Sequence, residues 1–257
     1  MMNTLFLAWR SGYTVEAATP PKASWFPIGR LDRTDNGNEL YTFRYLKGAR
    51  IAKSVAGFSP LEAFPVLSEV YTSSELFSVF SNRIPNPRRS DFSEIVERMD
   101  LEDKADPFRI LSISGGARQT DTLEIFPLLT TSPEGDFVCR FFIHGSRFMH
   151  ESSNVAMNNL AVGEKLRVCF EANNPATGWA IQLQTIDKPQ IIGYVPRYLL
   201  PDLHSIRKSD DQEYLSAIVT KVNAAPAPLN QRFLVELKGR LPAGQAMMSS
   251  TEFEVLS

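Results

Sequence analysis

Residues that could carry acid–base, nucleophilic or metal chemistry are few in this chain of 257 residues. The three histidines, His144, His150 and His204, stand at no spacing that is typical of metal ligands. Cys139 and Cys169 each lie in an apolar, strand-like run, which predicts two buried core thiols. The sequence holds no Walker loop, nucleophile elbow, zinc-peptidase helix or dinucleotide fingerprint. We therefore expect no catalytic residue, no metal site and no cofactor, and a chain that is not an enzyme.

Two segments could still contact an anion. Ser114-Gly-Gly-Ala-Arg118 could present backbone N–H groups with an arginine beside them, although a glycine turn between two strands is the favoured interpretation. The loop 82–89 holds three arginines and two prolines, and it could contact phosphate or an acidic partner. A solvated loop paired with nearby carboxylates is the favoured interpretation there as well.

The charge is balanced along the chain. Residues 1–130 hold 15 basic and 16 acidic side chains, residues 131–257 hold 12 and 13, and the net charge is −2. Because affinity for a nucleic-acid backbone comes mainly from neutralised phosphates, this chain is not expected to coat DNA. A nucleic-acid site would have to be small and local. No apolar run is long enough to span a membrane, and we expect a cytoplasmic protein with no membrane partner.

The elements that must position such a site change in kind along the chain. In the first half, apolar runs predict strands at 5–9, 25–31 and 40–45, with a hairpin turn at Asp35-Asn-Gly-Asn38. Apolar spacing predicts helices after Ser73 and over 90–99. Residues 108–113 and 122–126 are predicted to form a hairpin-like pair of strands. We expect an α+β module over residues 1–130.

The second half is predicted to be mostly β. Candidate strands lie at 137–144, 166–171, 179–186, 190–195, 213–222 and 231–238. Short strands at this spacing are typical of a small barrel, and one helix is expected to follow Pro196. The turn-rich segment 131–135 is the expected domain boundary, so the barrel would occupy residues 131–257.

Four short segments of this second half follow one another in a distinctive order. They are Gly145-Ser-Arg147-Phe148, Val162 to Glu171, Asn173-Asn174-Pro175 followed by Trp179-Ala-Ile181, and Ile192-Gly-Tyr-Val-Pro-Arg197. In order and spacing these segments resemble the HIRAN domain, a small β-barrel module that is related to SH3 and OB folds and binds DNA. The resemblance covers roughly the residues from Phe137 to Arg240.

The resemblance implies a binding site for single-stranded DNA, since fork-remodelling members of the family capture a DNA 3′ end. It implies six DNA-binding residues: Arg147, Phe148, Asn173, Asn174, Tyr194 and Arg197. The arginines would pair with phosphate, the aromatic rings would stack on bases, and an asparagine would bond to a base edge or to the backbone. Phe148 could instead belong to the core, Tyr194 could be a half-buried barrel residue, and Asn174 could serve only its turn.

The sequence also departs from the family pattern. Where such domains follow Asn-Asn-Pro with an aromatic residue and an aspartate, this chain has Ala176 and Thr177. A stacking surface and a carboxylate acceptor for a terminal hydroxyl are therefore missing at these positions. This departure leaves the polarity of the bound DNA end open.

The first half resembles, more faintly, the N-terminal subdomain of HipA-like kinases. The resemblance lies in Ile28-Gly-Arg-Leu31, Leu40 to Tyr45 and Leu76 to Pro85. No kinase body follows, so no phosphotransfer is implied. Two functions remain in view: a bacterial-type, non-enzymatic protein that binds single-stranded DNA or DNA ends, and a regulatory subunit of a toxin–antitoxin-like or DNA-processing system. The second would contact a protein partner through residues 1–130.

Overall fold

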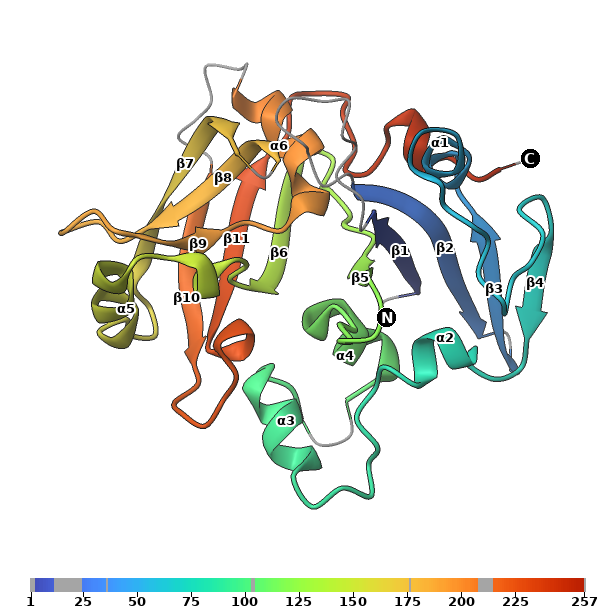
Figure 1. Ribbon diagram of the computed structural model, residues 1–257, viewed down its shortest axis with the longest axis horizontal. Coiled ribbons are helices and arrows are strands. Elements are labelled where there is room, and N and C mark those ends of the chain that lie inside the picture. Colours follow the sequence, from blue (N-terminus) through green and yellow to red (C-terminus); the bar gives the residue numbers. More distant parts are fainter. Residues whose placement is uncertain are drawn as a thin grey trace. The chain divides into compact units, whose positions relative to one another are not determined.

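The computed structural model describes residues 3–11, 25–35, 37–102, 105–175, 177–207 and 215–256. The chain divides into two compact units (Figure 1). The first comprises residues 1–93, 103–128 and 248–257, and the second comprises residues 94–102 and 129–247. Both are mixed α/β structures with antiparallel sheets. None of the helices in the described ranges is long and apolar enough to cross a membrane.

The first unit is built on a five-stranded sheet of order β4-β3-β2-β1-β5. Its strands are β1 (Thr4–Arg10), β2 (Trp25–Asp35), β3 (Glu39–Tyr45), β4 (Val70–Ser73) and β5 (Leu123–Pro127). Its helices are α1 (Lys47–Ala56), α2 (Ser78–Ser81) and α4 (Pro107–Ser114), with a short turn of 3₁₀ helix, η5 (Thr251–Phe253). Aromatic side chains fill its core, where the rings of Phe43 and Phe64 stack 3.9 Å apart. The strands predicted for this half are confirmed, apart from one.

The exception is the segment 108–113, which was predicted as a strand and forms most of helix α4. Pro107 stands at the first helical turn, and Gly115 ends the helix at φ 69°, with its N–H bonded to the Leu111 carbonyl. Phe108 and Leu111, three residues apart, are both fully buried, as a helix face requires. The predicted hairpin-like pair is therefore wrong, and its second strand, β5, pairs with β1 instead.

The second unit is built on a six-stranded antiparallel sheet of order β6-β11-β10-β7-β8-β9. Its strands are β6 (Asp136–Phe142), β7 (Lys165–Asn174), β8 (Gly178–Gln184), β9 (Ile191–Tyr194), β10 (Ser216–Val222) and β11 (Phe233–Arg240). Between them lie η1 (Ser146–Phe148), α5 (Glu151–Asn158), η2 (Arg197–Leu199), α6 (Leu200–Arg207) and η4 (Leu229–Gln231). The predicted strands of this half and the helix after Pro196 are confirmed, except that residues 213 and 214 of the predicted strand 213–222 lie outside the described residues.

One face of this sheet forms the core of the second unit. Phe137, Cys139 and Phe141 of β6 are buried, as are Val235 and Leu237 of β11, whereas the residues between them in β6 are more exposed. The two edge strands of the sheet meet at one point, because a bridge joins His144, just past β6, to Tyr194 in β9. A fully closed barrel stays a prediction.

The segment 94–102, which contains most of α3 (Phe92–Arg98), belongs to the second unit. The Asn223 amide donates to the Arg98 carbonyl at 2.9 Å, and Arg140 donates to Asp100 at 2.6 Å. The two units are therefore not divided at a single position near residue 130. Residues 94–102 belong to the second unit, and residues 248–257 belong to the first. The contacts that assign residues 94–102 to the second unit join residues far apart in the sequence, and no local sequence pattern predicts them.

Candidate functional site

The bridge between the sheet edges positions the first part of the candidate site. The His144 N–H donates to the Tyr194 carbonyl at 3.0 Å, and the Tyr194 N–H donates back at 2.8 Å. Gly193, at φ 148°, makes this approach possible: a Cβ there would lie 2.4 Å from the Ile143 side chain and 2.6 Å from the His144 carbonyl oxygen. Only a residue without a side chain lets β9 come this close.

A tight turn after β6 packs against the Tyr194 ring and leads into the first two predicted site residues. Gly145, at φ 70°, precedes η1, and a Cβ on it would lie 3.0 Å from a Tyr194 ring carbon. Ser146 is buried within the turn, while Arg147 and Phe148 are exposed. Gly145 therefore contacts Tyr194 two residues before Arg147 in the chain.

Phe148 is 72% exposed, so it does not belong to the core. The Arg147 guanidinium lies over the Phe148 ring, 4.5 Å from its centroid, in a cation–π arrangement. Among the described residues, Arg147 makes no ion pair with a carboxylate. Burying a phenylalanine side chain stabilises a protein by about 1.5–3 kcal/mol, and this one remains in solvent with a cation on its face. A flat ring beside a guanidinium can receive a base and its phosphate.

Asn174, Glu171 and Tyr194 form a hydrogen-bonded cluster at the end of β7. Asn174 is buried, and its amide donates to the Glu171 carboxylate at 3.0 Å. The Tyr194 hydroxyl shares hydrogen bonds with both residues. Burial, and then the charge of Glu171, raise the pKa of Tyr194 above its ordinary value of 10.0. The hydroxyl is therefore protonated at neutral pH, and its O–H donates to the Glu171 carboxylate.

The two neighbouring asparagines differ in their surroundings. The Asn174 side-chain oxygen accepts from the Thr177 N–H at 3.1 Å and from the Thr177 hydroxyl at 3.0 Å, so it holds the turn together. Asn173 is exposed and adopts φ 74°, at an irregularity in the pairing of β7 with β8. Asparagine tolerates this left-handed conformation better than most residues. Asn174 positions the cluster, and Asn173 displays its amide to solvent.

Arg197 begins η2, three residues after Tyr194, and it is half-buried. The structure thus groups Arg147 with Phe148 and Asn174 with Tyr194, and the Gly145 turn connects the two groups. Asn173 and Arg197 adjoin the second group along the chain. The functions of all six residues stay predictions.

Glu171 is a potential site residue that the sequence reasoning missed. Ala176 lies outside the described residues. The Thr177 hydroxyl takes part in the turn, where it donates to the Trp179 carbonyl at 2.6 Å. The carboxylate that the sequence lacks at position 177 is present instead at Glu171, beside Tyr194. No spacing in the sequence marks this role, because it depends on hydrogen bonds with Asn174 and with Tyr194 of another strand.

The two segments of the first half that could contact an anion are hydrogen-bonded to each other. Arg83 is almost fully buried, and it donates to the Gly116 carbonyl at 2.7 Å and to Asp121 at 2.5 Å. Arg89 pairs with Asp91 at 2.8 Å. The glycine turn is confirmed, but it joins helix α4 to β5 and not two strands. The interpretation of a solvated loop paired with carboxylates is confirmed for Arg89 and is wrong for Arg83, whose side chain is buried.

Both cysteines are free thiols, but only one is a core residue. Cys139 is buried near the Tyr198 hydroxyl, and burial raises its pKa to about 12, so the thiolate is suppressed. Cys169 is half-buried, and the prediction of a core thiol is wrong there. Leu166 lies on the buried face of β7, and Cys169 lies on the opposite face. Within the described residues, no cluster of His, Cys, Asp or Glu could hold a metal ion.

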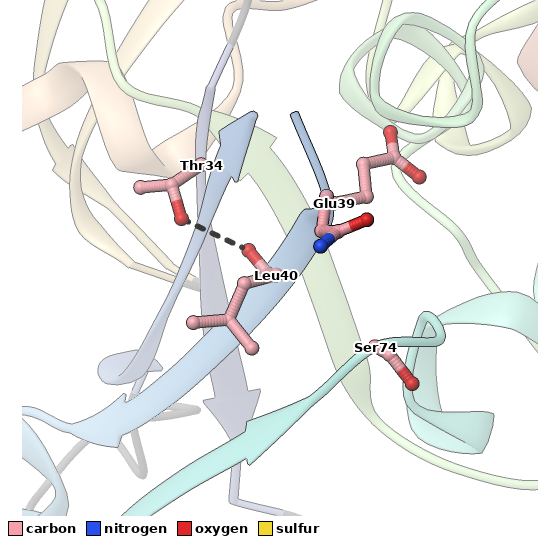
Figure 2. Close-up of a pocket in the computed structure, with 5 residues that line it drawn as sticks. Thr34, Glu39, Leu40 and Ser74 are labelled. Carbon is pink, nitrogen blue, oxygen red and sulfur yellow. Dashed lines mark hydrogen bonds between the residues drawn. The ribbon is translucent and has the colours of Figure 1, made fainter. Parts of the chain in front are cut away.

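A hollow in the first unit lies at the end of the β2–β3 hairpin (Figure 2). It is lined by Thr34, Asn38, Glu39, Leu40 and Ser74. Figure 2 shows the Thr34 hydroxyl bonded to the Leu40 carbonyl across the hairpin, at 3.5 Å. Glu39 is the single titratable residue of this lining, and it also accepts from the Tyr41 hydroxyl at 2.9 Å. The lining offers no pair of groups for acid–base chemistry.

Comparison with known proteins identifies the second unit. No curated protein and no solved structure gave a significant match to the chain. Residues 136–238 match the family model of the HIRAN domain. The matched range contains all six strands of the second sheet, apart from the last two residues of β11. The resemblance of the first half to HipA-like kinases stays a prediction. HIRAN domains are generally DNA-binding modules, and the C-terminal half of this chain carries one.

Proposed function

We propose that this chain is a non-enzymatic DNA-binding protein that holds single-stranded DNA or a DNA end on its HIRAN unit. The bound nucleotides would contact Arg147, Phe148, Asn173, Asn174, Tyr194 and Arg197. The observation that carries the proposal is the Arg147–Phe148 pair, which stands in solvent directly after Gly145, the residue that packs against the Tyr194 ring. Aromatic stacking and phosphate pairing then come from one turn of the chain.

The surrounding groups support a terminal nucleotide better than a continuous duplex. Stacking on Phe148 requires a base whose face is free, which a strand end or a single strand offers. Glu171 provides a carboxylate acceptor for a terminal hydroxyl at a different position from the family pattern, and the hydrogen bonds from Asn174 and Tyr194 hold it in place. The single bridge between the sheet edges supports an SH3/OB-like barrel whose rim carries these residues.

The balanced charge of the chain supports a small site. With a net charge of −2, the protein lacks the general positive field that binds long duplexes unspecifically. Two arginines in the site correspond to about two neutralised phosphates. For single strands, the slope of log K against log salt would then be roughly −1.4.

Fluorescence anisotropy with short labelled DNAs tests the proposal. The panel contains single strands ending in a 3′-hydroxyl or a 3′-phosphate, strands with only the 5′ end accessible, and a blunt duplex. Saturable binding of at least one single strand, with a shallow salt slope, is expected, and the preferred end reveals the polarity. Absence of binding to every member at low salt would overturn the proposal.

The regulatory-subunit alternative also stays a prediction. It requires a protein partner for residues 1–130, and a stable co-purifying protein lost on changing that half would support it. None of the contacts described in the first unit favours it over DNA binding.

A further inference from the structure

The face of the sheet that carries Tyr194 continues beyond the candidate site. Strand pairing sets Tyr194 opposite Gln182, and Gln182 opposite Cys169. One step along the strands, Gln184 stands opposite Arg167. Because directly opposed residues of antiparallel strands project to the same side, all of these side chains share the face of Tyr194. This face is the one that does not form the core.

Two exposed cations line this face along β7. Arg167 and Lys165 alternate with the buried Leu166, and neither makes an ion pair within the described residues. A strand rises about 3.3 Å per residue, which places Arg167 roughly 13 Å and Lys165 roughly 20 Å from Glu171. These distances exceed what one nucleotide at Tyr194 can reach, so the cations are separate from the terminal site.

Amide groups occupy the space between the cations and Tyr194. Gln184 donates to the Gln182 side-chain oxygen at 2.8 Å, and both side chains are half-exposed. This pairing leaves the Gln182 amino group and the Gln184 oxygen for other partners. Within the three described strands β7, β8 and β9 the single acidic residue is Glu171, which Asn174 already engages. The face is therefore cationic and polar away from its terminal site.

We propose that the DNA strand whose end sits at Tyr194 continues over the outer face of β7 and β8, with its phosphates at Arg167 and Lys165. Gln182 and Gln184 would contact the sugars or base edges between them. This inference rests on the proposed function and extends it from a terminal site to a longer track. Charge complementarity selects the occupant: two unpaired cations in line with an aromatic terminus suit a single polyanionic strand.

The test compares a trinucleotide with a dodecanucleotide, both of thymidine and both labelled at the end that does not bind. The full-length wild-type protein should bind the dodecamer at least tenfold more tightly than the trimer. Arg167→Ala and Lys165→Ala should each weaken dodecamer binding about three- to tenfold and reduce its salt slope by roughly 0.7. Trimer affinity should stay within twofold of wild type.

Lys238→Ala is the matched control, because Lys238 is an exposed cation on the outer face of β11 that pairs with Glu236 at 2.9 Å. It removes the same charge and should leave both affinities unchanged. Arg167→Gln, which retains more of the side chain, guards against misfolding of the alanine variant. The track would be overturned if the wild type bound both lengths with equal affinity, or if the β7 variants left dodecamer binding unchanged. In either case, binding of the trimer would still support the proposed function. Failure of the wild type to bind either DNA would overturn both.

Discussion

Phe148 shows the candidate site at the scale of one residue. Its ring is 72% exposed and is covered on one side by a guanidinium, so its removal takes little from the folded core. We predict that Phe148→Ala changes the free energy of unfolding by less than about 0.5 kcal/mol. DNA affinity should fall roughly 5- to 100-fold, because base–aromatic stacking contributes about 1–3 kcal/mol.

Thermal melts and anisotropy titrations measure the two quantities separately. Val162→Ala provides the control, since Val162 is 65% exposed in the same unit and belongs to no predicted site. A Phe148→Ala protein that melts earlier but binds DNA normally would show that the ring is structural.

The two asparagines should respond differently to substitution. Asn174→Ala leaves the Thr177 N–H and the Glu171 carboxylate without their buried partner, so we expect a loss of stability of about 1–3 kcal/mol. Asn173→Gly keeps the left-handed backbone at φ 74° and deletes only an exposed amide. It should retain the wild-type stability and lose DNA affinity severalfold. Urea denaturation and DNA titration of the pair measure this, and equal effects on both quantities would contradict the assignment.

At the scale of elements, Gly193 controls how closely the sheet edges meet. A Cβ there would lie 2.4 Å from Ile143 and 2.6 Å from the His144 carbonyl, so Gly193→Ala must push β9 away from the end of β6. We predict a loss of stability of about 1–3 kcal/mol, together with weaker DNA binding as Tyr194 moves from its place.

Gly163→Ala is the matched control for that substitution. Gly163 has φ 88° but no atom within 4 Å of an added Cβ, so it carries the backbone cost without the clash. Differential scanning calorimetry of both variants separates the two effects. If Gly193→Ala melts no lower than Gly163→Ala, the close approach of the strands does not stabilise the unit.

The elements of this protein were predictable where a local pattern decides them. Apolar runs and the turn at residues 35–38 led to β2 and β3, and the pair nearest that turn is Asp35 with Glu39. Asn36 lies outside the described residues. The segment 108–113 failed because its β-branched and aromatic residues suggest a strand, while Pro107 and Gly115 enclose a helix. The capping residues were the better guide at that point.

The site was predictable in part for a related reason. The six proposed residues lie in ordered segments that can be compared by position, and the structure brings four of them together around the Gly145 turn. Glu171 escaped because its role depends on hydrogen bonds with Asn174 and Tyr194, which come from different strands. Long-range contacts of this kind leave no spacing in the sequence.

On the scale of the whole molecule, balanced charge is the property that shapes function. A net charge of −2 gives no long-range attraction for DNA, so the proposed binding would depend on local contacts of the HIRAN unit. The same property makes the site testable by single substitutions, because no surrounding positive field compensates for a lost arginine.

The central claim is that this unit binds DNA through the Arg147–Phe148 turn. The most direct measurement is an anisotropy titration of a short single-stranded DNA with the wild type, Arg147→Ala and Arg240→Ala. Arg240 is the control, since it lies on β11 and pairs with Asp136 at 2.6 Å. Saturable wild-type binding that falls about tenfold or more in Arg147→Ala, and persists in Arg240→Ala, is predicted. Equal affinities for the wild type and Arg147→Ala would contradict the claim, as would no wild-type binding at low salt.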